Sequence, residues 1–125
     1  LTPVYWQGSS AGLIVFDVLN RNSFEEVQNY IDLIKNVPKA TYMIVGNKID
    51  MKDKRAVSYE EALEFARKRS VSYLEVSAVT GQCVDDMFNE FCLQAIDNYI
   101  KSSHTSSETI SVDLTQPNDK KMRCC

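Results

Sequence analysis

Three short apolar runs, each followed by a helical pattern, constrain the fold of this chain more than any other feature. The runs cover residues 12–18, 41–46 and 72–76, and they are rich in β-branched and aromatic residues, as in strands buried on both faces. Strands that alternate with helices in this way are joined by right-handed crossovers and lie parallel. The order therefore predicts an α/β fold in which helices cover the faces of a parallel sheet.

The helices carry start signals and apolar sides of their own. Ser23 with Glu26, and Ser58 with Glu61, have the spacing of a capping box, so each serine is predicted to begin a helix. A third helix is predicted near the end of the domain, because apolar residues recur there at the spacing i, i+3, i+4. These residues are Val84, Met87, Phe88, Phe91, Cys92, Ala95, Ile96 and Tyr99.

The composition favours one soluble globular domain. Hydrophobic residues make up 44% and charged residues 25% of the 125 positions. With a net charge of −3, the chain has no electrostatic reason to bind nucleic acid, and we expect no such partner. No apolar run approaches the ~20 residues that span a bilayer, and the four cysteines form no evenly spaced disulfide framework. A cytosolic, reducing compartment fits these features.

Polar residues follow each apolar run, where ligands of parallel α/β sheets bind. The segments to consider are residues 17–20, 47–50 and 77–81. In the second segment, the Asp50 carboxylate is placed to accept hydrogen bonds from the N1–H and the 2-amino group of a guanine ring. Adenine has an acceptor at N1 and no 2-amino group, so a site built on these two bonds rejects it.

Neighbouring residues complete this predicted base site. Lys48 can lay its methylene stem along the purine face, and the Asn47 amide can join the base edge to nearby backbone. The loop with Ser77 and Ala78 would supply a backbone N–H to guanine O6, and the Ser77 hydroxyl would orient Asp50. The alternative is that these residues only form turns and that Lys48 is solvated.

These motifs resemble those of the Ras-like small GTPases, and of their Rab branch in particular. GNKID resembles the fourth guanine-nucleotide motif of that family, EVSAVTG the fifth, and residues 1–27 the Rab stretch that starts in the second switch. The resemblance covers residues 1–101. It implies a partial doubly wound parallel sheet of the P-loop NTPase type, with three strands and three helices remaining. The parent protein would be a GTP- and GDP-binding switch for vesicle or membrane trafficking.

Two departures from the Rab pattern affect function. Val79 stands where the fifth motif usually has Lys, so the stacking that Lys provides over the base is lost on that side. Trp6 and Gln7 replace the usual Tyr-Arg pair. Tyr5 matches a position that faces effectors in the family, so Tyr5 and Trp6 are the predicted effector-facing residues.

The phosphate-binding half of the family's site is missing from the sequence. The motif G-x-x-x-x-G-K-[ST] does not occur, because none of the four glycines is followed by Lys. The Mg²⁺-binding Thr and the segment D-T-A-G-Q would both precede Leu1. The start at Leu1 suggests a processed product, a partial reading frame or an excised piece. We expect no GTP hydrolysis by these residues alone, and an unpaired apolar edge on the strand at 12–18.

The segment 102–125 is rich in Ser and Thr, lacks helical periodicity and is predicted to be a disordered tail. Its last two residues, Cys124 and Cys125, follow basic residues and are predicted to carry two prenyl groups, which anchor a protein more stably than one. The alternative is an inert pair or an incidental metal site. Ile110, Val112 and Leu114 resemble the motif by which Rab tails dock on their escort protein, or are simply scattered.

The resemblance also implies partners and a location. The partners are the Rab escort protein, the prenyl transferase, the GDP-dissociation inhibitor, exchange and activating factors, effectors, and membranes reached through lipids. The location is the cytoplasm and the cytoplasmic face of intracellular membranes. Two other interpretations stay open: a short non-enzymatic product that binds escort or effector proteins, and an unrelated doubly wound domain with a coincidental N-K-x-D.

Overall fold

The computed structural model describes residues 7–37 and 39–103, and within them three strands and three helices alternate. All strands are parallel and are ordered β1-β2-β3, with Asp17 opposite Asn47 and Gly46 opposite Glu75. The elements are β1 (Ala11–Asp17), α1 (Arg21–Ile34), β2 (Thr41–Asn47), the 3₁₀ turn η2 (Lys52–Lys54), α2 (Tyr59–Arg67), β3 (Ser72–Glu75) and α3 (Val84–Ser103). This architecture confirms the predicted partial α/β fold.

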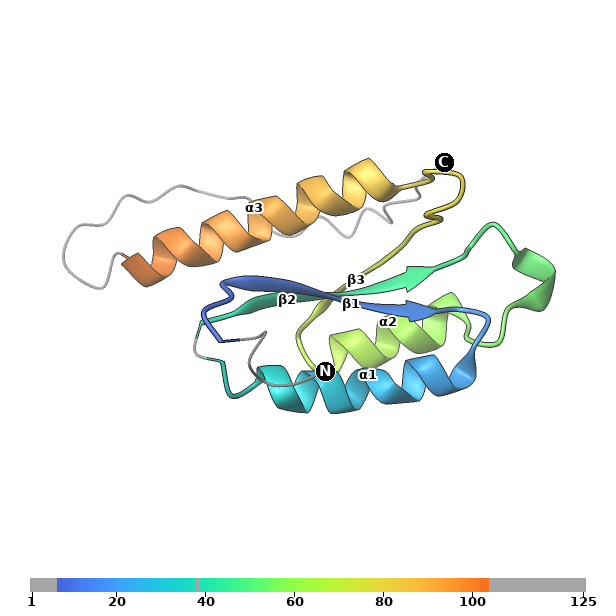
Figure 1. The fold of residues 1–125 in the computed structure, drawn as a ribbon, viewed down its shortest axis with the longest axis horizontal. Coiled ribbons are helices and arrows are strands. Elements are labelled where there is room, and N and C mark those ends of the chain that lie inside the picture. Colours follow the sequence, from blue (N-terminus) through green and yellow to red (C-terminus); the bar gives the residue numbers. More distant parts are fainter. Residues whose placement is uncertain (1–6, 38, 104–125) are drawn as a thin grey trace.

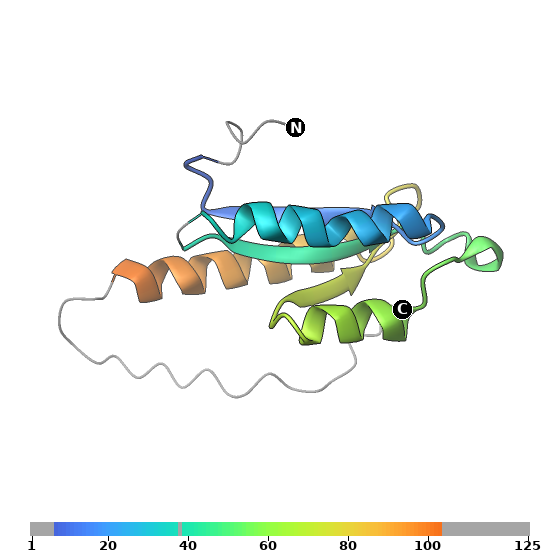
Figure 2. The same cartoon turned by 90° about the horizontal axis from the view of Figure 1, so that it is seen from below.

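The sheet lies between two helical layers, with α1 and α2 on one face and α3 on the other (Figures 1 and 2). The face under α1 and α2 is well covered, and its buried residues form one continuous cluster. They are Ile14, Phe16, Val18, Phe24, Val27, Ile31, Ile34, Ile44, Val57, Ala62, Ala66 and Tyr73. Because side chains of a strand alternate between faces, the next residues along β1 and β2 point toward α3.

The α3 face has a much smaller core. Its buried residues are Met43, Val45, Val76 and Met87. Only one edge of the predicted apolar stripe of α3 packs on the sheet, while Phe88, Ile96 and Tyr99 are 49%, 56% and 68% exposed. On the same face, Val15 of β1 is 55% exposed, and β1 pairs with no described strand other than β2. The expected apolar strand edge is therefore present.

The predicted start of the first helix is wrong by three residues. Asn20 is the N-cap of α1, and its side-chain oxygen accepts hydrogen bonds from the N–H groups of Asn22 and Ser23. The Ser23 hydroxyl instead donates to the carbonyls of Asp17 and Asn20 and accepts from the Asp17 N–H. Asn and Ser both cap helices well, so the spacing of Ser23 and Glu26 was not enough to exclude Asn20 as the cap.

The second predicted helix start is confirmed. The Ser58 side chain accepts a hydrogen bond from the Glu61 N–H at 3.2 Å, as in a capping box. The Glu61 carboxylate of α2 forms an ion pair with Arg21 of α1 and so connects these two helices. At the other end of the domain, α3 includes Ser102, which the sequence assigned to the tail. Within the described ranges, no helix combines the length and the apolar character that spanning a bilayer requires.

Candidate base-recognition site

The predicted site residues gather at one edge of the sheet, beyond the carboxyl ends of the strands. Asp17 and Asn47 end β1 and β2 and are register partners, while Ser77 follows β3 by two residues. A backbone bond from the Val76 N–H to the Gly46 carbonyl, at 2.8 Å, continues the pairing of β2 and β3 toward this edge. The fold thus brings together three loops that are far apart in the sequence.

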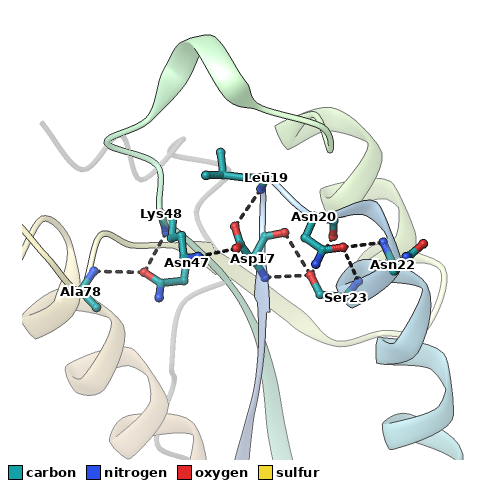
Figure 3. A network of polar contacts seen from close by, with 8 residues as sticks. All are labelled: Asp17, Leu19, Asn20, Asn22, Ser23, Asn47, Lys48 and Ala78. Carbon is teal, nitrogen blue, oxygen red and sulfur yellow. Dashed lines mark hydrogen bonds and ion pairs between the residues drawn. The ribbon is translucent and has the colours of Figure 1, made fainter.

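Asn47 joins the loop after β2 to the loop after β3. Its side-chain oxygen accepts hydrogen bonds from the Ala78 N–H at 3.0 Å and from the Lys48 N–H at 2.8 Å (Figure 3). The predicted contact of the Asn47 amide with neighbouring backbone is therefore present. In this structure the Ala78 N–H is therefore directed at Asn47, so guanine O6 would have to share this donor or replace Asn47.

Asp50 is held by the serine that the sequence analysis chose as its partner. The Ser77 hydroxyl donates to one Asp50 carboxylate oxygen at 2.7 Å. Ser77 is fully buried, its N–H donates to the Gln82 carbonyl at 3.0 Å, and its own oxygen accepts from the Thr80 N–H at 3.2 Å. Asp50 itself is exposed. A rigid buried hydroxyl thus orients a solvent-facing carboxylate.

Lys48 is held by a residue to which the sequence analysis gave no role. Its ammonium group lies 2.5 Å from an Asp17 carboxylate oxygen, and the other Asp17 oxygen accepts from the Leu19 N–H (Figure 3). Burial alone would raise the pKa of Asp17, but the hydrogen bonds from Lys48 and Leu19 and the charge of Lys48 outweigh it and lower this pKa. The position of Asp17 at the strand end was the available signal.

The remaining predicted site residues divide into two groups. Val79 is 85% exposed beside Ala78, so it offers a short apolar side chain where the Rab pattern has a long cationic one. Tyr5, Trp6, Cys124 and Cys125 lie outside the described residues, and their predicted roles stay predictions.

Among the residues that the structure describes, no set matches the phosphates and the Mg²⁺ ion that the resemblance implies. None of the glycines is followed by Lys. Among residues 7–37 and 39–103, no three His, Cys, Asp or Glu side chains come together as a metal site would require. The arrangement presents a carboxylate acceptor, an amide and a lysine stem at one edge. These groups can recognise a base.

Comparison with known proteins decides the family. The family model that matches residues 1–98 is described as the Ras family. The chain belongs to the Ras family.

Three of the similar curated proteins are Rab proteins. The chain is 33% identical to Ras-related protein Rab-4 of Dictyostelium discoideum over 113 residues, which is 89% of this chain and 55% of that protein. It is 35% identical to Ras-related protein Rab-13 of Mesocricetus auratus over 127 aligned positions, 97% of this chain and 61% of that protein. For Ras-related protein RABF2a of Arabidopsis thaliana, the identity is 38% over 92 residues, 72% and 46% of the two chains.

These matches confirm the resemblance to Rab-type small GTPases and exclude the interpretation as an unrelated doubly wound domain. The chain spans about half to three fifths of the length of these relatives. The family binds guanine nucleotides, so a base site at the observed edge of the sheet agrees with the membership. What the whole protein does is a separate question.

Proposed function

We propose that this chain recognises guanine through Asp50 and forms the base-binding part of a Rab-type nucleotide switch. Asp50 accepts from N1–H and the 2-amino group, Lys48 covers one face of the ring, and Asn47 and Ala78 close the base edge. The observation that supports this most is the bond from the buried Ser77 hydroxyl to the exposed Asp50 carboxylate. This bond fixes the direction of the carboxylate before a base arrives, which a carboxylate that reads a base requires.

The expected affinity of the isolated chain is low. Two hydrogen bonds to a carboxylate contribute roughly 3–6 kcal/mol, and about 4 kcal/mol corresponds to a millimolar Kd. Titration of the ¹⁵N-labelled chain with GMP and AMP, followed by NMR, is sensitive in this range. We expect GMP to shift the signals of residues 47–50 and 77–79 with a Kd of ~1 mM and AMP to bind about tenfold more weakly.

A substitution that changes the reading of the base gives the sharpest control. Asp50→Asn replaces one acceptor by an N–H donor, which suits xanthine because xanthine has a carbonyl at C2. The variant should lose its preference for GMP and gain one for XMP. Asp53→Asn, in the exposed turn η2, removes the same charge nearby and should leave the preference unchanged. Equal affinity of the unaltered chain for GMP and AMP would contradict the proposal.

The whole protein, in this proposal, cycles between GDP and GTP with Mg²⁺ and recruits trafficking effectors from the cytoplasmic face of a membrane. Its support is the membership of the Ras family together with the Rab relatives. Joining the chain to the part of Rab-13 that its match does not cover should give a protein that binds GDP tightly. In that protein, Asp50→Asn should accelerate GDP release, and unchanged release would count against the role of Asp50.

Membrane attachment would come from prenylation of Cys124 and Cys125, with the escort protein, the prenyl transferase and the GDP-dissociation inhibitor as partners. Two lipids, or one lipid together with basic residues, are needed because one prenyl chain anchors only marginally. Replacing both cysteines by Ser should move the full-length protein from membranes to the cytosol. If the doubly substituted protein stays on membranes, lipidation at these residues is refuted.

The alternative that the sequence left open, a short non-enzymatic product that binds escort or effector proteins, differs from the switch in the mass of the endogenous protein. A species near 14.2 kDa supports the short product, and a species of the length of the relatives supports the switch.

A further inference from the structure

An ion pair joins the far end of the Asp50 loop to β3. The Arg55 guanidinium faces the Glu75 carboxylate with two parallel contacts, Nη1 to Oε2 at 3.0 Å and Nη2 to Oε1. The third guanidinium nitrogen, Nε, donates to the Val57 carbonyl at 2.6 Å. Both side chains are largely shielded from water, with 26% and 12% of their surfaces exposed. A bidentate pair in this setting fixes geometry more strongly than a single contact on the surface.

Glu75 is itself held in place by Tyr73, which lies on the same strand. The Tyr73 hydroxyl donates to its Oε1 at 2.5 Å, and the Tyr73 ring is buried and stacks on Phe16 at a centroid distance of 6.1 Å. Burial, followed by the hydrogen bond to Glu75, raises the pKa of Tyr73 well above its usual value, so the hydroxyl stays a donor. The acceptor of Arg55 is therefore anchored in the closed core of the sheet.

The Arg55–Glu75 pair lies close in sequence to the residues of the base site, on both of its partners. Asp50 is followed by Met51 and the turn η2, in which no residue is buried, and then by Arg55. Glu75 precedes Ser77, the residue that orients Asp50, by two positions. The loop is thus fastened to the β3 side near its start by the bond between Ser77 and Asp50, and near its end by Arg55.

We propose that Arg55 and Glu75 are positioning residues for guanine recognition, which hold the loop so that both Asp50 oxygens line up with the base edge. This inference rests on the proposed function. Neither residue touches the base. Their loss leaves a carboxylate that still attracts N1–H but no longer meets the 2-amino group in the same geometry.

The test is the ratio of GMP to IMP affinity, because IMP differs from GMP only by lacking the 2-amino group. In the unaltered 125-residue chain, NMR titration should give a ratio of about ten, the effect of one hydrogen bond to a carboxylate. In Glu75→Gln, which keeps the size of the side chain and removes its charge, the ratio should fall to about three or less. General destabilisation changes the melting temperature and not this ratio.

The chain offers a matched control in a second bidentate Arg–Glu pair. Arg21 and Glu61 join α1 to α2 through Nη1–Oε1 at 2.5 Å and Nη2–Oε2 at 2.8 Å, and Arg21 Nη2 also donates to the Ala56 carbonyl at 3.0 Å, so this pair contacts the end of the same loop without involving Glu75. Glu61→Gln should leave the GMP to IMP ratio at the value of the unaltered chain. Arg55→Lys keeps the charge but not the planar fork, and its ratio should lie between those of the unaltered chain and Glu75→Gln.

The outcomes separate the two proposals. If GMP is preferred over AMP but Glu75→Gln and Arg55→Lys both keep the full GMP to IMP ratio, the positioning role is overturned and the proposed function stands. If the unaltered chain does not distinguish GMP from AMP, the proposed function fails and the positioning role falls with it. If Glu75→Gln does not fold, the amide spectrum shows it, and the ratio in Arg55→Lys decides in its place.

Discussion

The two faces of the sheet differ in how completely they are covered. Among the described residues, twelve buried ones form one cluster under α1 and α2, whereas four form the cluster on the α3 side. The apolar stripe of α3 has the helical spacing throughout, yet Ile96 and Tyr99 are more than half exposed. An apolar pattern therefore predicts which side of a helix can be buried. How much of that side is buried depends on the surface available to pack against it.

The largest expected effect tests this difference directly. Ile31 is fully buried on the closed face, so Ile31→Ala should cost about 2–5 kcal/mol of the free energy of unfolding. Ile96, of the same type but 56% exposed, should cost less than about 1 kcal/mol when replaced by Ala. Urea unfolding of the two variants measures both values. Similar losses would show that the α3 face is covered in solution.

A second test probes the packing density of the closed face near the site. A Cβ on Gly46 would lie 2.6 Å from the Tyr73 hydroxyl and 2.9 Å from Val18 Cγ1. Gly46→Ala should therefore cost about 1–3 kcal/mol through overpacking. Gly12 is the control, because its Cβ would meet nothing within 4 Å. Thermal unfolding of the two alanine variants should show a loss for Gly46 alone.

The loss of folding stability at alkaline pH should distinguish Tyr73, which is buried under α1 and α2, from Tyr99, which is exposed on α3. The raised pKa of Tyr73 means that the folded chain keeps a proton that the unfolded chain releases above pH 10.0. This stability is fully present below pH 10.0 and is lost as the pH rises further, by up to about 1.4 kcal/mol per pH unit.

Unfolding measured between about pH 9 and 11 should show a shallower loss for Tyr73→Phe than for the unaltered chain. Tyr99→Phe is the control, because the Tyr99 side chain is 68% exposed on α3. Equal slopes for all three proteins would contradict the burial of Tyr73.

The smallest expected effect concerns the Asp17–Lys48 ion pair, at the carboxyl ends of β1 and β2. The lowered pKa of Asp17 means that its contribution is present above its ordinary value of 3.8 and is lost as the pH falls below it. Because the pair with Lys48 is partly exposed, the loss should stay below about 1 kcal/mol. Acid unfolding of Asp17→Asn should lack this step. A deeper loss would place the pair in a less hydrated site than the structure shows.

The sequence predicted the fold well where local chemistry is decisive. The parallel strands alternating with helices, the Ser58 cap and the contact of Ser77 with Asp50 followed from periodicity, spacing and base chemistry. The α1 cap was missed because Asn20 and Ser23 are both good caps, and tertiary bonds of Ser23 to the Asp17 backbone chose between them. Arg55 and Glu75 were missed because their pairing spans twenty positions and only the folded sheet brings them together.

The central claim is that one carboxylate reads the edge of a guanine ring, and a structure of the chain with bound GMP tests it most directly. The account predicts that both Asp50 oxygens lie within hydrogen-bond distance of N1 and the 2-amino group of the base, with the Ser77 hydroxyl still bonded to Asp50. A base bound elsewhere, or an Asp50 side chain turned away from it into solvent, would contradict the account.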